Sequence, residues 1–400
     1  MEKELHLITW CFPPMNVPRS IQISRLIMNL KMKLNIYCGF DPQNYDNSIS
    51  PKISQHIGKY GGNIFTIKEN NYDLLKKKVI SKFSNSSFFP DNFQMWSEKA
   101  IKIILSKKLV KKESTIVSFS QPISDHFVGY NIKKRIGCNW ILHFSDPWSI
   151  NPYLKLDQNK KKQVILWEKE FFKVADKIIF TSNETANVYK ELYQIYKKKI
   201  FVLNHISPKS LSKKQNKNEK IIFRYLGNLY VDRSPITIFK AIDFLKQSNP
   251  CLNEKIKIEF IGDFQFLSTK IKNEIKKYNH LRDVIIFKKK VSYKKSLDLM
   301  RNSDVLIVID SFSKNKNLFF PSKLADYLTT NKTIIGITGN GETKNFLKRT
   351  NGYIFNHHQF KKLAVFIDDV IKKKKVRKIK RILDYTGNSV KDKFIEIINS

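Results

Sequence analysis

Short apolar runs alternate with segments of helical periodicity along most of the chain. Leu5–Cys11, Thr115–Phe119 and Asn139–Phe144 are rich in apolar residues, as strands buried on both faces are. Between such runs, Ile123–Ile136 carries apolar residues at the spacing of one helix face. This alternation predicts an α/β fold with doubly wound parallel sheets.

The chain is too long for one compact core. Its 400 residues suit two domains of roughly 150–200 residues each. A first strand–helix series spans residues 1–207, and a polar, basic stretch at 208–220 is predicted to be a linker. A second series occupies residues 221–375, and residues 376–400 are predicted to form a basic helical tail.

A strand–loop–helix–strand unit in the second series carries the strongest site prediction. Val305–Ile309 has the pattern of a buried strand, a polar loop follows, and a helix is expected over Lys323–Leu328. Ligands of open α/β sheets lie beyond the carboxyl ends of strands, where a helix start suits a phosphate. Lys323 would place a cation there, and Asp326 a carboxylate for sugar hydroxyls. A surface helix with a solvated lysine and aspartate is the alternative.

A second phosphate-type loop lies upstream. The predicted strand Ile221–Leu226 is followed directly by Gly227, which lets the backbone approach a ligand closely. Arg233 can clamp phosphate oxygens with its planar guanidinium, and the pair Ser234–Pro235 predicts a helix start with the serine as its cap. Two such loops on one sheet predict a site for a diphosphate.

The chain is strongly basic. Lys and Arg number 73 against 35 Asp and Glu, which gives a net charge of +38. Such a charge favours a nucleic-acid partner, but the basic runs are scattered instead of interleaved with aromatic residues on one face. Docking on an anionic membrane surface is the other partner that this charge supports. A basic nucleic-acid-binding protein is therefore kept only as an alternative.

Cysteine usage and hydropathy indicate the compartment. The 4 cysteines are scattered and show no paired spacing, so neither a disulfide framework nor a zinc site is predicted. The apolar run at the N-terminus is too short for a signal peptide, and no stretch has the roughly 18 apolar residues of a membrane span. We expect a cytoplasmic protein that is either soluble or bound peripherally to the inner membrane face.

Several segments, in this order and spacing, resemble the GT-B glycosyltransferases, and within them the retaining family 4 group of bacterial surface polysaccharide synthesis. The similar segments are WCFPPMNVPRSIQISRL, SFSQPISDHFVGYNIKKRIGCNWILHFSDPW, ADKIIFTSNETANVY, FRYLGNLYVDRSPITIFKAI and VSYKKSLDLMRNSDVLIVID with the helix and strand that follow it. The resemblance implies two Rossmann-like domains that face each other across a cleft. It places a nucleotide sugar on the carboxyl domain and an acceptor on the amino domain.

The resemblance also implies residue roles on the donor side. Gly227 and Arg233 would bind the donor diphosphate, Ser322 and Lys323 would bind it from the opposite side, and Asp326 stands at the position of the family's ribose-binding acidic residue. Leu318 stands where many members have a glutamate that touches the donor sugar. The identity of the sugar therefore stays open.

The activity implied is transfer of a hexose, with retention, from a UDP- or GDP-sugar to a lipid-linked or polysaccharide acceptor of the cell surface. Members of the family match the charge of the leaving diphosphate with cations and helix dipoles. No cluster in this sequence has metal-ligand spacing, so neither a metal nor another cofactor is expected. A nucleotide-sugar 2-epimerase of the same fold, which needs no acceptor, is the alternative activity.

Four residues of the first half are candidates for the acceptor side. Asp146 follows a predicted strand and could take or orient the acceptor proton, or it could be a turn aspartate. Arg19, in the first loop, could meet an acceptor phosphate, or it could be a solvated charge. Ser120 ends a strand and His126 lies in a helix, and a structural role is the alternative for this histidine.

Overall fold

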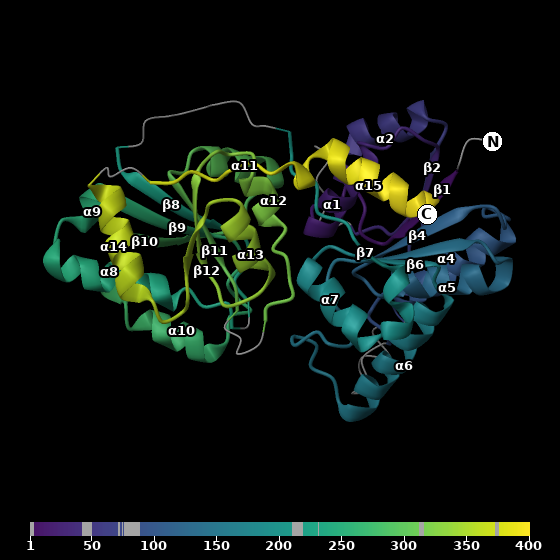
Figure 1. The fold of residues 1–400 in the computed structure, drawn as a ribbon, viewed down its shortest axis with the longest axis horizontal. Coiled ribbons are helices and arrows are strands. Elements are labelled where there is room, and N and C mark those ends of the chain that lie inside the picture. The colour runs from purple at the N-terminus through teal and green to yellow at the C-terminus, as the bar shows by residue number, and fades with distance from the viewer. Residues whose placement is uncertain are drawn as a thin grey trace. The chain divides into compact units, whose positions relative to one another are not determined.

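The computed structural model describes residues 4–41, 50–70, 73, 75, 89–209, 219–230, 232–311, 316–372 and 376–400 (Figure 1). The chain forms two compact units. The amino-terminal unit comprises Met1–Ile206 together with Gly387–Ser400, and the carboxyl-terminal unit is Ser207–Thr386. The last helix therefore belongs to the first unit, although the whole second unit precedes it in the sequence.

The described part of the amino-terminal unit contains a parallel sheet of 7 strands in the order β3-β2-β1-β4-β5-β6-β7. The strands are β1 (Leu5–Thr9), β2 (Leu34–Cys38), β3 (Asn63–Thr66), β4 (Thr115–Ser120), β5 (Asn139–Phe144), β6 (Lys177–Phe180) and β7 (Ile200–Val202). The strand order reverses between β1 and β4. In such sheets the crevice at the carboxyl ends of these two strands is where ligands bind.

Helices cover both faces of this sheet. Neighbouring residues of a strand point to opposite faces, so Ile116 of β4 joins one buried cluster and Val117 joins the other. The face of Val117 carries α1 (Pro18–Ile27), α2 (Ser50–Lys59) and α15 (Gly387–Asn399), and the face of Ile116 carries α4 (Gln94–Ser106), α5 (Ser124–Ile136), α6 (Gln158–Val174) and α7 (Asn183–Leu192). A 3-10 helix, Gln194–Lys199, leads into β7.

The carboxyl-terminal unit repeats this plan with 6 parallel strands, in the order β10-β9-β8-β11-β12-β13 within its described residues. The strands are β8 (Ile221–Leu226), β9 (Ile256–Ile261), β10 (Ile285–Lys288), β11 (Val305–Ile309), β12 (Thr333–Ile337) and β13 (Tyr353–Phe355). One face carries α8 (Ile236–Ser248), α9 (Leu252–Lys255), α10 (Thr269–Lys276) and α14 (Phe360–Ile371), and the other carries α11 (Tyr293–Arg301), α12 (Lys323–Tyr327) and α13 (Glu342–Arg349). Two 3-10 helices span Asn279–Leu281 and Leu383–Tyr385. Here the order reverses between β8 and β11.

The predicted fold class is confirmed, because both units are α/β and both sheets are parallel. The strands predicted at Asn139–Phe144, Ile221–Leu226 and Val305–Ile309 have those bounds. Continuous apolar runs locate these strands well because helices bury both of their faces. No comparable run marks β13, which has only 3 residues.

The start of α8 differs from the prediction. Pro235 occupies the N-cap position, and the Ser234 side chain makes no helix cap. Its Oγ accepts a hydrogen bond from the Ile236 amide at 3.3 Å instead, which forms a local serine turn. The serine still supplies an acceptor to the helix start, but from one residue further back than predicted.

The carboxyl end of the chain differs from a single helical tail. Residues 376–382 have no regular secondary structure, and only α15 is helical beyond the short 3-10 turn. Val390, Phe394 and Ile397 of α15 are buried in the core of the amino-terminal unit. The apolar stripe of this helix, and not its basic residues, decides where it packs. Most of the predicted linker, residues 210–218, lies outside the described residues.

Candidate functional site

The carboxyl ends of β8 and β11 bring two predicted loops together in the carboxyl-terminal unit. Gly227 follows β8 directly, and Asp310 follows β11 directly. The two strands are neighbours in the sheet, with Val305 paired to Phe223. Because the strand order reverses between them, the loops lie at the switch point of the sheet, where open α/β sheets bind ligands.

Gly227 occupies a position that requires glycine. Its φ is 129°, a conformation that residues with a β-carbon rarely adopt. Its amide donates to the Ile261 carbonyl at 2.9 Å, and its own carbonyl lies where a β-carbon at Gly262 would stand, 2.2 Å away. Two glycines thus let the turns after β8 and β9 pack backbone against backbone.

The ammonium of Lys323 points at this glycine. A β-carbon added to Gly227 would stand 2.8 Å from the Lys323 Nζ, which itself lies 3.7 Å from the centre of the Tyr225 ring. This Nζ is buried and has no hydrogen-bond acceptor among the described residues. Burial lowers the pKa of Lys323 well below its ordinary value, and the charge of Arg233 lowers it further, whereas Asp310 raises it.

Arg233 and Asp310 complete a buried charge cluster with Lys323. The Arg233 side chain is 8% exposed, its guanidinium lies 4.5 Å from the centre of the Tyr230 ring, and its Nε has no hydrogen-bond partner among the described residues. Asp310 is 1% exposed; its Oδ2 accepts from the Thr338 hydroxyl at 2.7 Å, but its Oδ1 has no partner in the described part of the chain. When Lys323 is protonated, the two cations and one carboxylate carry a net positive charge, which a bound anion would compensate.

Asp310 has the same kind of signal in the sequence as Gly227. An acidic residue stands directly after a continuous apolar strand, where the parallel sheet presents its ligand edge. The sequence pattern places it in a polar loop and predicts no role for it. The structure adds it to the candidate site because it is one of the charges that act on Lys323.

Ser322 and Asp326 flank Lys323 on α12. Ser322 is the N-cap residue of this five-residue helix, and its side chain makes no capping bond. Asp326 is 8% exposed, and its Oδ1 accepts from the Tyr293 hydroxyl at 3.2 Å. The acidic charge that acts on Lys323 is that of Asp310, so the two acidic residues of this region have different surroundings.

A pocket of about 560 Å³ lies beside Gly262, at the carboxyl ends of β9 and β10. Phe264 and Phe287 line it, with ring centres 5.0 Å apart, and Lys288–Lys290 form its basic wall. Its volume is that of a small-molecule site. Since Gly262 packs against Gly227, the pocket continues the same sheet edge.

In the amino-terminal unit, Arg19 is a buried residue and not a solvated charge. It stands in the first turn of α1, is 7% exposed, and donates to the His143 carbonyl at 3.1 Å and lies 3.0 Å from the His143 Nδ1. Its guanidinium lies 5.3 Å from the centre of the Phe119 ring. Burial lowers the pKa of Arg19 to about 10, although the charge of Asp146 opposes this shift.

Asp146 lies near Arg19 beyond the end of β5. It is partly exposed, and the Ser145 hydroxyl lies 3.4 Å from its Oδ2. Its charge is the largest of those that raise the pKa of Arg19. The structure therefore brings Arg19 and Asp146, the two charged candidates for the acceptor side, together near the carboxyl end of β5.

Ser120 and His126 are enclosed more completely. Both are 0% exposed, and the Ser120 Oγ has no hydrogen-bond partner among the described residues. The His126 Nδ1 lies 2.8 Å from the Ser118 hydroxyl, and its ring packs edge-on against Phe144 at 4.4 Å. Burial lowers the pKa of His126 well below its ordinary value, so this imidazole is neutral at pH 7. These contacts match the structural alternative for His126.

Asp125 is a buried carboxylate for which sequence reasoning had no signal, since it lies within a helical pattern. It is 0% exposed, and both of its oxygens accept from the Trp10 amide, at 3.1 and 3.0 Å. Burial raises its pKa well above the ordinary value, while the Trp10 bond opposes that shift. The residue ties the loop after β1 to the start of α5.

No group of three or more His, Cys, Asp or Glu side chains within the described residues has a geometry that could hold a metal ion. In the same part of the chain, no helix is both long enough and apolar enough to span a bilayer.

The sequence matches no protein-family model and no curated protein sequence. Solved structures resemble it over its whole length. HepE from Anabaena, in complex with UDP and glucose, has a TM-score of 0.62 at 10% identity, with 100% of both chains covered. The N-terminal domain of trehalose-6-phosphate phosphatase from Candida albicans has a TM-score of 0.66 at 13% identity, over 100% of this chain and 97% of that one.

A glycosyltransferase from Rickettsia africae is also similar, with a TM-score of 0.59 at 16% identity, over 99% of this chain and 97% of that one. The lipopolysaccharide outer core galactosyltransferase WaaB has a TM-score of 0.55 at 13% identity, with 99% of both chains covered. At such identities the likeness shows the fold, which is that of the GT-B glycosyltransferases.

Proposed function

We propose that the chain is a retaining glycosyltransferase that moves a hexose from a UDP- or GDP-sugar to a lipid-linked or polysaccharide acceptor. The observation that carries the proposal is the buried Lys323 ammonium at the switch point, which has no hydrogen-bond acceptor among the described residues. Burial of a cation costs roughly several kcal/mol of folding free energy unless a partner compensates its charge. A diphosphate at the Gly227 loop would supply that partner.

The proposed donor site uses the carboxyl-terminal unit. Gly227 is partly exposed and faces Lys323, so a diphosphate at this glycine meets the ammonium without an intervening side chain. Arg233 supplies the second cation, and the Ser322 hydroxyl supplies a donor that its helix does not use. Cations held in place before the reaction stabilise the charge that develops on the leaving diphosphate. We propose no metal or other cofactor for this step.

The rest of the nucleotide fits the same edge. Asp326 would accept hydrogen bonds from the ribose hydroxyls, as its position in the family pattern suggests. The pocket lined by Phe264 and Phe287 offers aromatic surface for the base. On the acceptor side, Asp146 would take or orient the proton of the attacking hydroxyl, and the nearby Arg19 would bind an acceptor phosphate.

Titration calorimetry with UDP, GDP and their hexose conjugates tests the donor site. We expect one nucleotide to bind, with the diphosphate needed for affinity, and the same nucleotide to bind Lys323→Met more weakly. Absence of binding to every nucleotide would overturn the proposal. Conversion of a nucleotide sugar to its 2-epimer in the absence of any acceptor would establish the alternative activity instead.

The place of the reaction in the cell follows from the same chemistry. Nucleotide sugars are made inside the cell, so we propose a cytoplasmic enzyme. An acceptor attached to a lipid would lie at the inner membrane face. The net charge of +38 would attract the chain to the anionic lipids there.

A further inference from the structure

A groove of about 660 Å³ runs between α4 and α5 of the amino-terminal unit, and none of the site residues named so far lines it. The lining residues of α4 recur every three to four positions: Gln94, Glu98, Ile101, Lys102 and Leu105. Those of α5 recur every four positions: Phe127, Asn131 and Arg135. Side chains at this spacing share one face of a helix. At 1.5 Å per residue, the lining stripes are roughly 18 Å long on α4 and roughly 12 Å long on α5.

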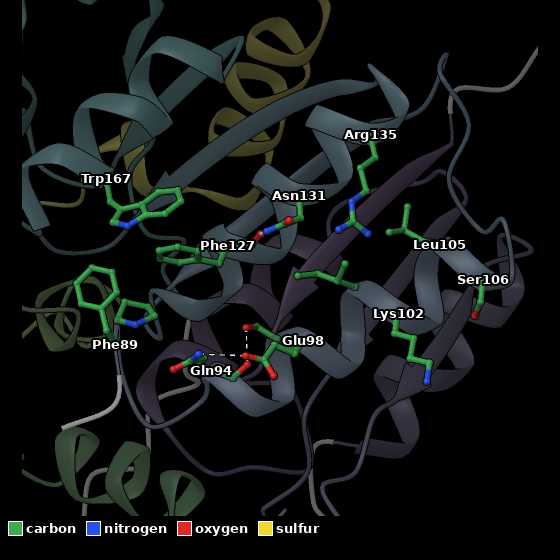
Figure 2. Close-up of a pocket in the computed structure, with 13 residues that line it drawn as sticks. Phe89, Gln94, Glu98, Lys102, Leu105, Ser106, Phe127, Asn131, Arg135 and Trp167 are labelled. Carbon is green, nitrogen blue, oxygen red and sulfur yellow. Dashed lines mark hydrogen bonds between the residues drawn. The ribbon is translucent and has the colours of Figure 1, made fainter. Parts of the chain in front are cut away.

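The two ends of the groove differ in chemistry (Figure 2). Phe89, Phe127 and Trp167 gather at one end, with ring centres 6.0 Å apart for the first pair and 4.7 Å for the second. Lys102 and Arg135 stand at the other end. Both are exposed, and neither has an acidic partner among the described residues.

The polar groups between these ends already have partners. The Gln94 amide donates to the Glu98 carboxylate at 3.0 Å, and the Asn131 amide donates to the Phe127 carbonyl of its own helix at 2.9 Å. The apolar wall in the middle of the groove is Ile101, beside the exposed Glu98 carboxylate, whereas Leu105 lies next to Arg135 at the cationic end. A peptide would leave backbone groups unpaired against such a wall, whereas an aliphatic chain has none to pair.

The position of the cations separates this groove from the proposed reaction site. Both helices connect parallel strands and so run antiparallel to them; α5 begins just beyond the carboxyl end of β4 and ends just before β5. Lys102 and Arg135 therefore lie toward the amino edge of the sheet, whereas Arg19 and Asp146 lie at its carboxyl edge. An anion held by Lys102 and Arg135 is not the group that reacts.

We propose that this groove binds the chain of a single anionic lipid, with its phosphate between Lys102 and Arg135 and its tail toward Phe127 and Trp167. Arginine binds phosphate through its planar fork, and lysine adds a point charge. The aromatic end supplies the apolar area that holds the tail. The inference is independent of the glycosyltransferase proposal, because it uses no residue of the nucleotide site.

The test uses the full chain and soluble probes below their micelle concentrations. Calorimetric titration with dodecyl phosphate should show one saturable site, and inorganic phosphate should not bind. Dodecyl maltoside, whose head is uncharged, should have an affinity at least roughly tenfold lower than that of dodecyl phosphate. The double variant Lys102→Gln/Arg135→Gln should reduce dodecyl phosphate binding to the level of the maltoside. Ile101→Gln, in the apolar wall of the groove, should weaken both amphiphiles.

A matched control keeps the same change of charge on the same two segments. Lys107→Gln/Lys134→Gln removes two exposed lysines that do not line the groove, and it should bind dodecyl phosphate like the unchanged chain. An equal loss in this control, or no saturable binding of dodecyl phosphate, would overturn the proposal. Binding to vesicles of phosphatidylcholine and phosphatidylglycerol without binding of monomeric dodecyl phosphate would also overturn it, in favour of attachment by surface charge alone. Nucleotide binding should be unchanged in every groove variant.

Discussion

The Lys323 ammonium lies against the one side of Gly227 that carries no substituent. A β-carbon at residue 227 would stand 2.8 Å from the Lys323 Nζ and 3.3 Å from its Cε. One residue follows a strand and the other opens a helix almost a hundred positions later, and the parallel sheet brings them to the same edge. The contact places the ammonium of one β-α unit against the backbone of another.

Gly227→Ala should lower stability and remove nucleotide binding together. The backbone conformation costs a residue with a β-carbon about 1–3 kcal/mol, and the added methyl displaces Lys323. Thermal unfolding and calorimetric titration with UDP would measure the two effects. Gly137→Ala is the matched control, since its φ is also positive but nothing lies within 4 Å of the added carbon. It should lose stability and keep UDP binding; an alanine at 227 that binds UDP normally would remove the glycine from the site.

Lys323→Met should raise the melting temperature while it lowers UDP affinity. Methionine has nearly the length of lysine and removes a buried cation that has no acceptor among the described residues. A residue kept at a cost in stability is typical of a functional site. Differential scanning calorimetry with and without UDP would show both effects. Lys295→Met, an exposed lysine of α11, should change neither quantity; a lower melting temperature for Lys323→Met would mean that the ammonium stabilises the fold.

Binding of a nucleotide sugar should take up a proton at Lys323. Burial lowers the pKa of this ammonium in the free protein, so a smaller fraction of it is protonated than for an ordinary lysine. A bound diphosphate stabilises the charged form and raises the pKa, so affinity falls as pH rises from the lower pKa to the higher one. Titrations with UDP-glucose in buffers of different ionisation enthalpy would measure the uptake. The uptake should vanish in Lys323→Met; release of a proton on binding would contradict the assignment.

The elements of the fold are predictable from the sequence because apolar runs are its dominant signal. Val305–Ile309 is a strand in both the pattern and the structure, since helices bury both of its faces. The cap of α8 is not predictable to the residue, because Ser234 and Pro235 satisfy the preferences for more than one arrangement of the first turn.

The candidate site is predictable only in part, for a different reason. Gly227, Arg233 and Lys323 follow local rules of turn and helix start, so the sequence points to them. The role of Asp310 depends on its distance from Lys323, which only the order of the strands determines. Arg19 looks like a loop charge in the sequence, and its burial follows from contacts with Phe119 and His143, a hundred or more positions away.

Asp146→Asn should reduce sugar transfer by about 10²–10⁴-fold and leave UDP-glucose affinity unchanged, if this carboxylate handles the acceptor proton. The residue belongs to the amino-terminal unit, whereas the proposed nucleotide contacts belong to the carboxyl-terminal unit. Release of UDP from UDP-glucose with a crude lipid extract as acceptor would follow the reaction. Asp157→Asn is the control, because the Asp157 carboxylate caps α6 through the Lys160 amide at 2.8 Å. It should leave both stability and turnover nearly unchanged, because asparagine caps a helix start about as well as aspartate. Full turnover in Asp146→Asn would make Asp146 a turn residue that holds the end of β5.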